Sequence, residues 1–158
     1  MTLFSMHCHQ QLPITLDEAW AFISNPGNLS VITPPDMNFT IISPTSNAIY
    51  AGQLIEYKVS PFKGIAVDWV TEITHVSDRQ FFVDEQRFGP YAFWHHKHFL
   101  KEIPGGVEMD DIIHYKLPMG PIGGMFNPLI VKPKLTKIFE FRKQKLTALF
   151  GDFKNPQQ

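Results

Sequence analysis

The sequence has only one cysteine, no long apolar run and no excess of charge of one sign. Its single cysteine, Cys8, excludes an internal disulfide, and nothing indicates an oxidising compartment. No apolar run approaches the roughly 18 residues of a membrane-spanning helix, and no leader of basic, apolar and small residues opens the chain. We therefore expect a cytoplasmic protein with no signal peptide and no stable membrane insertion.

The charge balance also excludes a class of partner. The formal net charge is -1 with histidines neutral, whereas a protein that grips nucleic acid needs a basic surface. The stretch FWHHKHF, residues 93–99, does not change this view, because its aromatic and basic side chains alternate across a strand instead of lining one exposed platform. We expect no nucleic-acid partner.

What the sequence does have is enough apolar material for one core. Its 158 residues are 44% hydrophobic and 18% charged, which favours a folded chain with a single domain, residues 1–158. Aromatic residues make up 13%, and fourteen of them are phenylalanine. Such bulk either fills a core or lines a cavity for an apolar ligand.

The order of elements predicts an antiparallel sheet with a helix near each end of the chain. Thr15 and Glu18 form a capping-box pattern before a helix that stops at Asn25-Pro26. Short turns join most of the later strand-like segments, which indicates an antiparallel meander. The segments rich in β-branched and aromatic residues are 3–12, 39–43, 53–59, 66–76, 80–88, 93–103 and 107–117.

A long terminal helix is predicted from Pro133 to Phe150, with Gly151 ending it. Arg142 falls on its apolar stripe, where a charged residue is unexpected. Residues 118–128 before this helix form a glycine- and proline-rich loop, which we expect to be either a gate or a simple tether. The apolar stripe consists of Val131, Leu135, Ile138, Phe139, Leu146, Leu149 and Phe150.

Alternation along the strands divides the polar residues between two faces. In 107–117, Asp111 and Tyr115 lie on the less polar face with Ile113, so we expect them to point inward. In 93–103, the lysines favour water, so Trp94, His96 and His98 are assigned inward and His95 outward. In 80–88, one face carries Phe82, Asp84, Gln86 and Phe88.

Two blocks, DEQRFGPYAFWHHKHF (84–99) and MDDIIHYKLPMGPIG (109–123), resemble the ligand-binding SRPBCC domain family of the START-like helix-grip superfamily. The resemblance implies an α+β fold, in which a curved seven-stranded antiparallel sheet wraps around the C-terminal helix and leaves a hydrophobic pocket. Relatives in the superfamily carry lipids, sterols or quinones, some act on aromatic polyketides as cyclases or hydratases, and some are fused to epimerase-like domains. No catalytic set transfers residue by residue.

We therefore predict a protein that binds a small hydrophobic molecule, such as a lipid, quinone or polyketide-like compound, without a cofactor or a resident metal. Two alternatives stay open: a cyclase, hydratase or hydrolase with His96, His98 and Asp111 as candidate catalytic residues, and an interaction module for an epimerase-like partner. The predicted ligand-binding residues are Trp69, Phe82, Asp84, Gln86, Trp94, His96, His98, Asp111, Ile113, Tyr115, Leu135, Ile138, Phe139 and Arg142.

Other roles are open for the same residues. The two inward histidines could ligate a metal with Asp84 or Asp111, or could form a buried hydrogen-bonded network with them. Arg142 could anchor an acidic or carbonyl oxygen, or could extend its charge to water at the pocket mouth. The aromatic wall could be ordinary core. Lysines 132, 134, 137, 143 and 145 give the last helix a basic face, which is either simply solvated or able to meet anionic lipid headgroups.

Overall fold

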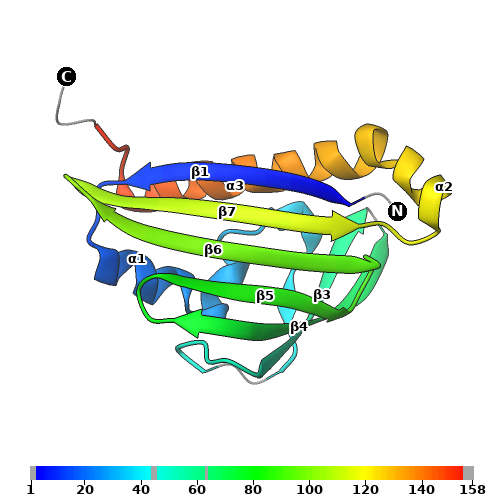
Figure 1. Ribbon diagram of the computed structural model, residues 1–158, viewed down its shortest axis with the longest axis horizontal. Helices are drawn as coiled ribbons and strands as arrows, with labels where there is room; N and C mark the ends of the chain where they lie inside the picture. Colours follow the sequence, from blue (N-terminus) through cyan, green and yellow to red (C-terminus); the bar gives the residue numbers. More distant parts are fainter. Residues whose placement is uncertain (1–2, 44–45, 63, 155–158) are drawn as a thin grey trace.

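A computed structural model describes residues 3–43, 46–62 and 64–154 (Figure 1). A strand and a short helix come first, a meander of strands follows, and a long helix comes last. In chain order the elements are β1 (Phe4–Leu12), α1 (Leu16–Ile23), η1 (Pro26–Ser30), η2 (Pro35–Met37), β2 (Thr40–Ile41), β3 (Gln53–Phe62), β4 (Ile65–Ser77), β5 (Phe81–Phe88), β6 (Phe93–Ile103), β7 (Gly106–Lys116), α2 (Gly120–Met125), η3 (Asn127–Val131) and α3 (Lys132–Phe150).

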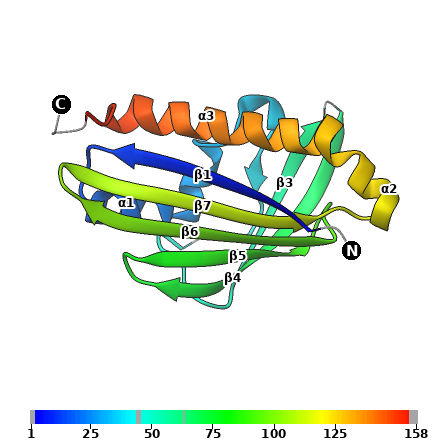
Figure 2. The same cartoon turned by 45° about the horizontal axis from the view of Figure 1, so that its top comes forward.

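The strands form one seven-stranded antiparallel sheet in the order β1-β7-β6-β5-β4-β3-β2. Strands β2 to β7 form a meander, and β1 adds to the free edge of β7. Helix α3 runs along the same side of the molecule as β1 and β7, as the two views show (Figure 2). The predicted α+β helix-grip architecture is therefore confirmed.

The register across the central strands brings polar residues into one row. Asp84 of β5 is paired with His96 of β6, and His98 of β6 is paired with Asp111 of β7. Asp111 is in turn opposite Cys8 of β1. Because each of these residues lies on the concave face of its strand, the register gathers their side chains near the middle of the sheet.

Local sequence signals explain where the first helix begins. The Thr15 hydroxyl accepts a hydrogen bond from the Glu18 amide at 3.2 Å, and the Glu18 carboxylate accepts one from the Thr15 amide at 2.9 Å. Asn25 then caps η1 through the Gly27 amide. The predicted capping box is confirmed, and α1 ends before Asn25-Pro26 as expected.

The core lies between the concave face of the sheet and the helices. Along β7, every second residue from Val107 to Tyr115 is buried, Asp111 included, and the residues between them are only partly so. From α3, Leu135 and Leu146 pack against this face at opposite ends. None of the helices in the described part of the chain combines the length and apolar character that crossing a bilayer requires.

Two predictions about side-chain orientation are wrong. Leu149 is 46% exposed and leaves the apolar stripe of α3, whereas its neighbour Phe150 packs edge-to-face on Phe22 with ring centroids 5.1 Å apart. Phe88 is 72% exposed. The register of β4 and β5 shifts between Val70 and Thr71, so the end of β5 no longer keeps the alternation of faces that placed Phe88 inward.

The prediction of a loop at 118–128 is also wrong, because most of the segment is helical. Helix α2 occupies Gly120–Met125, and a π-helical turn at Asn127–Val131 leads directly into α3. A proline lies in the first turn of α2, where its missing amide is tolerated. Only glycine fits at position 123, because a Cβ atom there would lie 1.8 Å from the Pro118 carbonyl oxygen.

Candidate functional site

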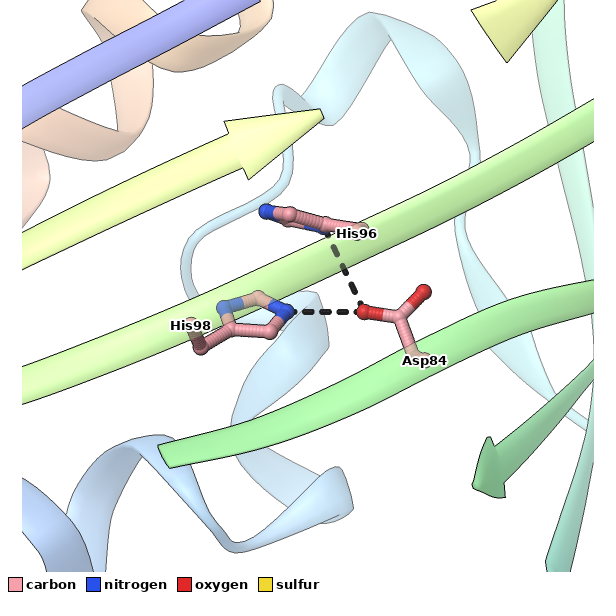
Figure 3. Close-up of side chains that lie close together, drawn as sticks. All are labelled: Asp84, His96 and His98. Carbon is pink, nitrogen blue, oxygen red and sulfur yellow. Dashed lines mark hydrogen bonds and ion pairs between the residues drawn. The ribbon is translucent and has the colours of Figure 1, made fainter. Parts of the chain in front are cut away.

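A cluster of five ionisable side chains lies on the inner face of the sheet beneath α3. Asp84 comes from β5, His96 and His98 from β6, Asp111 from β7 and Arg142 from α3. All except Asp84 are at most 8% exposed. The close-up shows both imidazoles turned toward the Asp84 carboxylate (Figure 3).

Each imidazole lies between the two carboxylates. His98 Nε2 donates to Asp84 Oδ2 at 2.7 Å, and His96 Nε2 donates to Asp111 Oδ1 at 3.1 Å, because an ionised carboxylate only accepts. His96 Nδ1 lies 3.3 Å from Asp84 Oδ2. Arg142 Nη1 lies 3.5 Å from Asp111 Oδ1. The result is a closed network of opposite charges.

The network favours the charged form of His96. Burial lowers the pKa of His96, but the charge of Asp84 and hydrogen bonds to both carboxylates outweigh it, so the net pKa is raised. An imidazole with both nitrogens against carboxylate oxygens is best satisfied when both carry protons. Protonated His96 and Arg142 then balance the two carboxylates.

Both carboxyl groups stay ionised despite burial. Burial alone would raise the pKa of Asp84, yet the His96 charge and hydrogen bonds from both histidines lower it well below the ordinary value. For Asp111 burial is again the largest single influence, and Arg142 with the two histidines reverses it. The carboxylates are therefore fixed acceptors.

Two buried polar atoms of the cluster lack a hydrogen-bond partner among the described residues, namely His98 Nδ1 and Arg142 Nε. His98 Nδ1 nevertheless makes an ion-pair contact with Asp111 Oδ1, at 2.7 Å. The Phe82 ring stacks on the imidazole of His98, with ring centroids 4.1 Å apart. An unpaired polar atom in such a site is costly unless another group satisfies it.

The cluster forms the polar end of a cavity of about 460 Å³ between the sheet and α3. The remaining wall is mostly apolar, with Ile55, Ile73, Trp69 and Trp94 from the sheet and Ile138 from α3. This volume lies in the roughly 300–1,000 Å³ range of small-molecule sites. The space between sheet and helix is therefore hollow rather than filled.

Most of the predicted ligand-binding residues line this cavity. Arg142 is among them and is buried in the cluster, so the alternative that its charge reaches water at the mouth is wrong. The predicted residues that line the cavity are Trp69, Phe82, Asp84, Trp94, His96, His98, Leu135, Ile138, Phe139 and Arg142.

Four predicted residues do not line the cavity, although each has a clear place nearby. Gln86 donates to the Tyr91 carbonyl oxygen at 2.7 Å and fixes the turn between β5 and β6. Tyr115 is 1% exposed and donates to Asn127 Oδ1 at 2.7 Å. Ile113 is fully covered. Asp111 lies behind the histidines and borders a second hollow, between β1 and α3.

Sequence reasoning missed part of the wall. Tyr57, Thr71 and Tyr91 line the cavity, and the Thr71 hydroxyl accepts from the Trp69 indole at 3.0 Å. Alternation in β3 could have revealed Tyr57, which follows Ile55 on the same face. Ile32 and Met37 lie around the irregular 3-10 turns η1 and η2, where no periodicity exists to reveal their direction.

One group in the cluster has the composition of a metal site. Asp84, His96 and His98 each offer a ligand atom, and these atoms lie within 4.8 Å of one another. However, His98 Nε2 and His96 Nε2 are already donors to carboxylates, and the guanidinium of Arg142 pairs with Asp111 beside them. An added cation would have to displace these protons and face an existing positive charge, which favours the hydrogen-bonded network.

No protein-family model and no curated protein matches this sequence. Solved structures of the same fold do match nearly the whole chain. Protein CV1439 from Chromobacterium violaceum has a TM-score of 0.71 at 10% identity, covering 94% of this chain and 98% of its own. Ginseng major latex-like protein 151 from Panax ginseng has a TM-score of 0.66 at 11% identity, covering 94% and 97%.

A third similar structure is a point mutant of norcoclaurine synthase from Thalictrum in complex with a transition-state analogue. Its TM-score is 0.65 at 12% identity, and the match covers 94% of this chain and 96% of that one. At such identities the likeness concerns the fold alone. The chain thus has the same fold as these structures, in agreement with the helix-grip fold that its sequence resemblance implies.

Proposed function

We propose that this chain acts as one domain that binds a small, largely apolar molecule between the sheet and α3. The observation that carries the proposal is the cavity of about 460 Å³, whose wall is mostly apolar and which has the buried charged cluster at one end. Apolar contacts would supply most of the affinity, at about 25 cal/mol per Å² removed from water. A polar group of the ligand would lie at the polar end of the cavity, which Asp84, His96, His98 and Arg142 line.

The ligand classes to test are fatty acids and other lipids, quinones and aromatic polyketides. Native mass spectrometry of the protein before and after solvent extraction should show a bound mass that extraction removes. A ligand at about 100 times its Kd adds about 2.7 kcal/mol to the free energy of unfolding, which raises Tm by roughly 5–10 °C for a chain of this size. No bound mass and no shift with any class would overturn the proposal.

A substitution on α3 tests where the ligand binds. Ile138→Trp extends an aromatic ring into the cavity, so the Kd should rise at least about tenfold while the unliganded fold is kept. Leu149→Trp is the matched control, because Leu149 is exposed on the same helix and away from the cavity. Equal Kd values for the two variants would place the ligand elsewhere.

An acid–base enzyme is a second candidate function, and the position of His96 favours it. His96 lines the cavity at its polar end, and the neighbouring carboxylates raise its pKa, so it would serve as the proton donor to a bound molecule. His96→Gln should then abolish turnover of a cyclase, hydratase or hydrolase substrate while binding persists. Retained turnover in this variant would exclude His96 as the acid.

The epimerase-like partner and the cytoplasmic location remain predictions. Pull-down from a native lysate should recover a stoichiometric epimerase-like protein if the chain is an interaction module, and an empty cavity in the recovered complex would favour that role. Cell fractionation with the full-length protein would test the location.

A further inference from the structure

The segment that precedes α3 presents an unusual amount of apolar surface. Six large side chains in it are between 42% and 77% exposed. Helix α2 carries part of this surface at one end of the molecule, beyond the end of the sheet (Figures 1 and 2). We name as the α2 patch the residues Met119, Ile122, Met125, Phe126, Leu129 and Ile130.

The α2 patch is continuous with the rim of the cavity. Met119 and Phe126 line the cavity and are also 71% and 49% exposed. Gly123 holds α2 against the Pro118 carbonyl, so the patch rests on a packed support. Whatever covers the patch therefore lies next to the route into the cavity.

The segment that carries the α2 patch and its flanks contains lysines but no acidic residue. Between Asp111 and Glu140 the sequence contains no acidic residue but four lysines, at 116, 132, 134 and 137. Within the described chain, Lys134 is the one of these four with an acidic partner, Asp36 at 3.7 Å. Lys132 and Lys137 are exposed on the first turns of α3. An apolar surface flanked by cations suits an interface that is apolar inside and anionic at its edge.

We propose that the α2 patch docks reversibly on a membrane surface that contains anionic lipid. The large apolar side chains would enter the boundary between headgroups and acyl chains, and the flanking lysines would contact the headgroups. Peripheral binding of this kind needs no membrane-spanning helix. It would place the cavity rim at the membrane, where an apolar ligand can enter or leave without crossing water.

A second copy of the chain fits the α2 patch less well. In a twofold dimer the same surface meets itself, so the lysines flanking one patch would approach those of the other. Like charges facing each other across an interface oppose association. An anionic lipid surface supplies the complementary charge instead.

Vesicle sedimentation of the full chain tests the proposal without any knowledge of the ligand. We expect binding to phosphatidylcholine vesicles that contain phosphatidylserine, much weaker binding to phosphatidylcholine alone, and loss of binding as salt is raised. Leu129→Ser with Met125→Ser should weaken binding at least about tenfold. Lys132→Gln and Lys137→Gln should each weaken it about fivefold.

Matched controls use the opposite end of the molecule. Leu149→Ser makes the same chemical change at an exposed position about 30 Å further along the helical segment. Lys101→Gln with Lys154→Gln removes the same charge elsewhere. Neither control should change vesicle binding. Because Met125 and Leu129 do not line the cavity, docking and ligand binding can fail separately.

Two results would overturn the docking proposal. One is wild-type protein that stays in the supernatant with anionic vesicles, or a patch variant that sediments as wild type does. The other is a dimer in analytical ultracentrifugation that Leu129→Ser dissociates, without any vesicle binding, which would identify the patch as a contact between copies.

Discussion

The buried pair of Asp111 and Arg142 should be strongly coupled in stability. Their charged atoms lie 3.5 Å apart, and each residue is 8% exposed. At an effective dielectric constant of about 20, two unit charges at this distance interact by about 5 kcal/mol. Removing one partner from a buried pair typically costs about 3–5 kcal/mol, because the other charge loses its compensation.

We therefore expect Arg142→Met and Asp111→Asn each to lower the free energy of unfolding by about 3 kcal/mol, the lower end of this range. In Arg142→Met, His96 still contacts Asp111 and compensates part of its charge. The double variant should lose clearly less than the two losses added, with a coupling of about 2 kcal/mol or more. Urea unfolding of the four proteins at neutral pH, followed by tryptophan fluorescence, measures these values.

An exposed pair provides the control for this cycle. Lys58 and Asp68 lie 3.7 Å apart, with side chains 59% and 78% exposed. Their coupling in Lys58→Met and Asp68→Asn variants should be about 0.2–1 kcal/mol and should fall in high salt. If the buried pair couples no more strongly than this exposed one, the reasoning about a closed charge network is wrong.

Three further predictions concern the titration of the cluster, the cysteine and the first helix. The raised pKa of His96 stabilises the fold at pH values below its ordinary pKa of 6.5, and this stabilisation is lost as pH rises through the folded pKa. The lowered pKa values of Asp84 and Asp111 stabilise the fold at pH values above 3.8, and this stabilisation is lost as pH falls. Tm should therefore be highest between these two limits, and its dependence on pH should be weaker in an Asp84→Asn, His96→Gln variant. Burial, with the charge of Asp111, raises the pKa of Cys8 from 9.0 to about 11, so iodoacetamide should alkylate it roughly 100-fold more slowly than a free thiol at neutral pH, and an equal rate would contradict the burial. Thr15→Ala should cost about 1 kcal/mol by removing the cap of α1, whereas Thr136→Ala within α3 should cost much less; equal losses would count against the capping argument.

The sheet could be predicted from the sequence because its signals are local. Turn residues bound each strand, and the choice of faces in β6 needed only the preference of Lys97 and Lys101 for water. His96 and His98 are buried and His95 is not, as expected. The prediction that the sheet wraps around α3 came from the resemblance of two sequence blocks to the helix-grip superfamily.

The arrangement of the charged cluster could not be predicted in the same way. The position of each imidazole between two carboxylates depends on the register of β5, β6 and β7, which no single strand encodes. The depth of Arg142 depends on how α3 packs. The helical form of α2 was missed because glycine and proline usually indicate a loop, whereas here Gly123 permits a close helix contact.

The most direct test of the account is a crystal structure of the protein with the tightest ligand from the binding screen. We predict density for that ligand inside the cavity, with its apolar part beside Ile138 and Trp69 and its polar group within hydrogen-bond distance of the charged side chains that line the polar end. Density outside the cavity, or an apolar end placed against the charged cluster, would contradict the account.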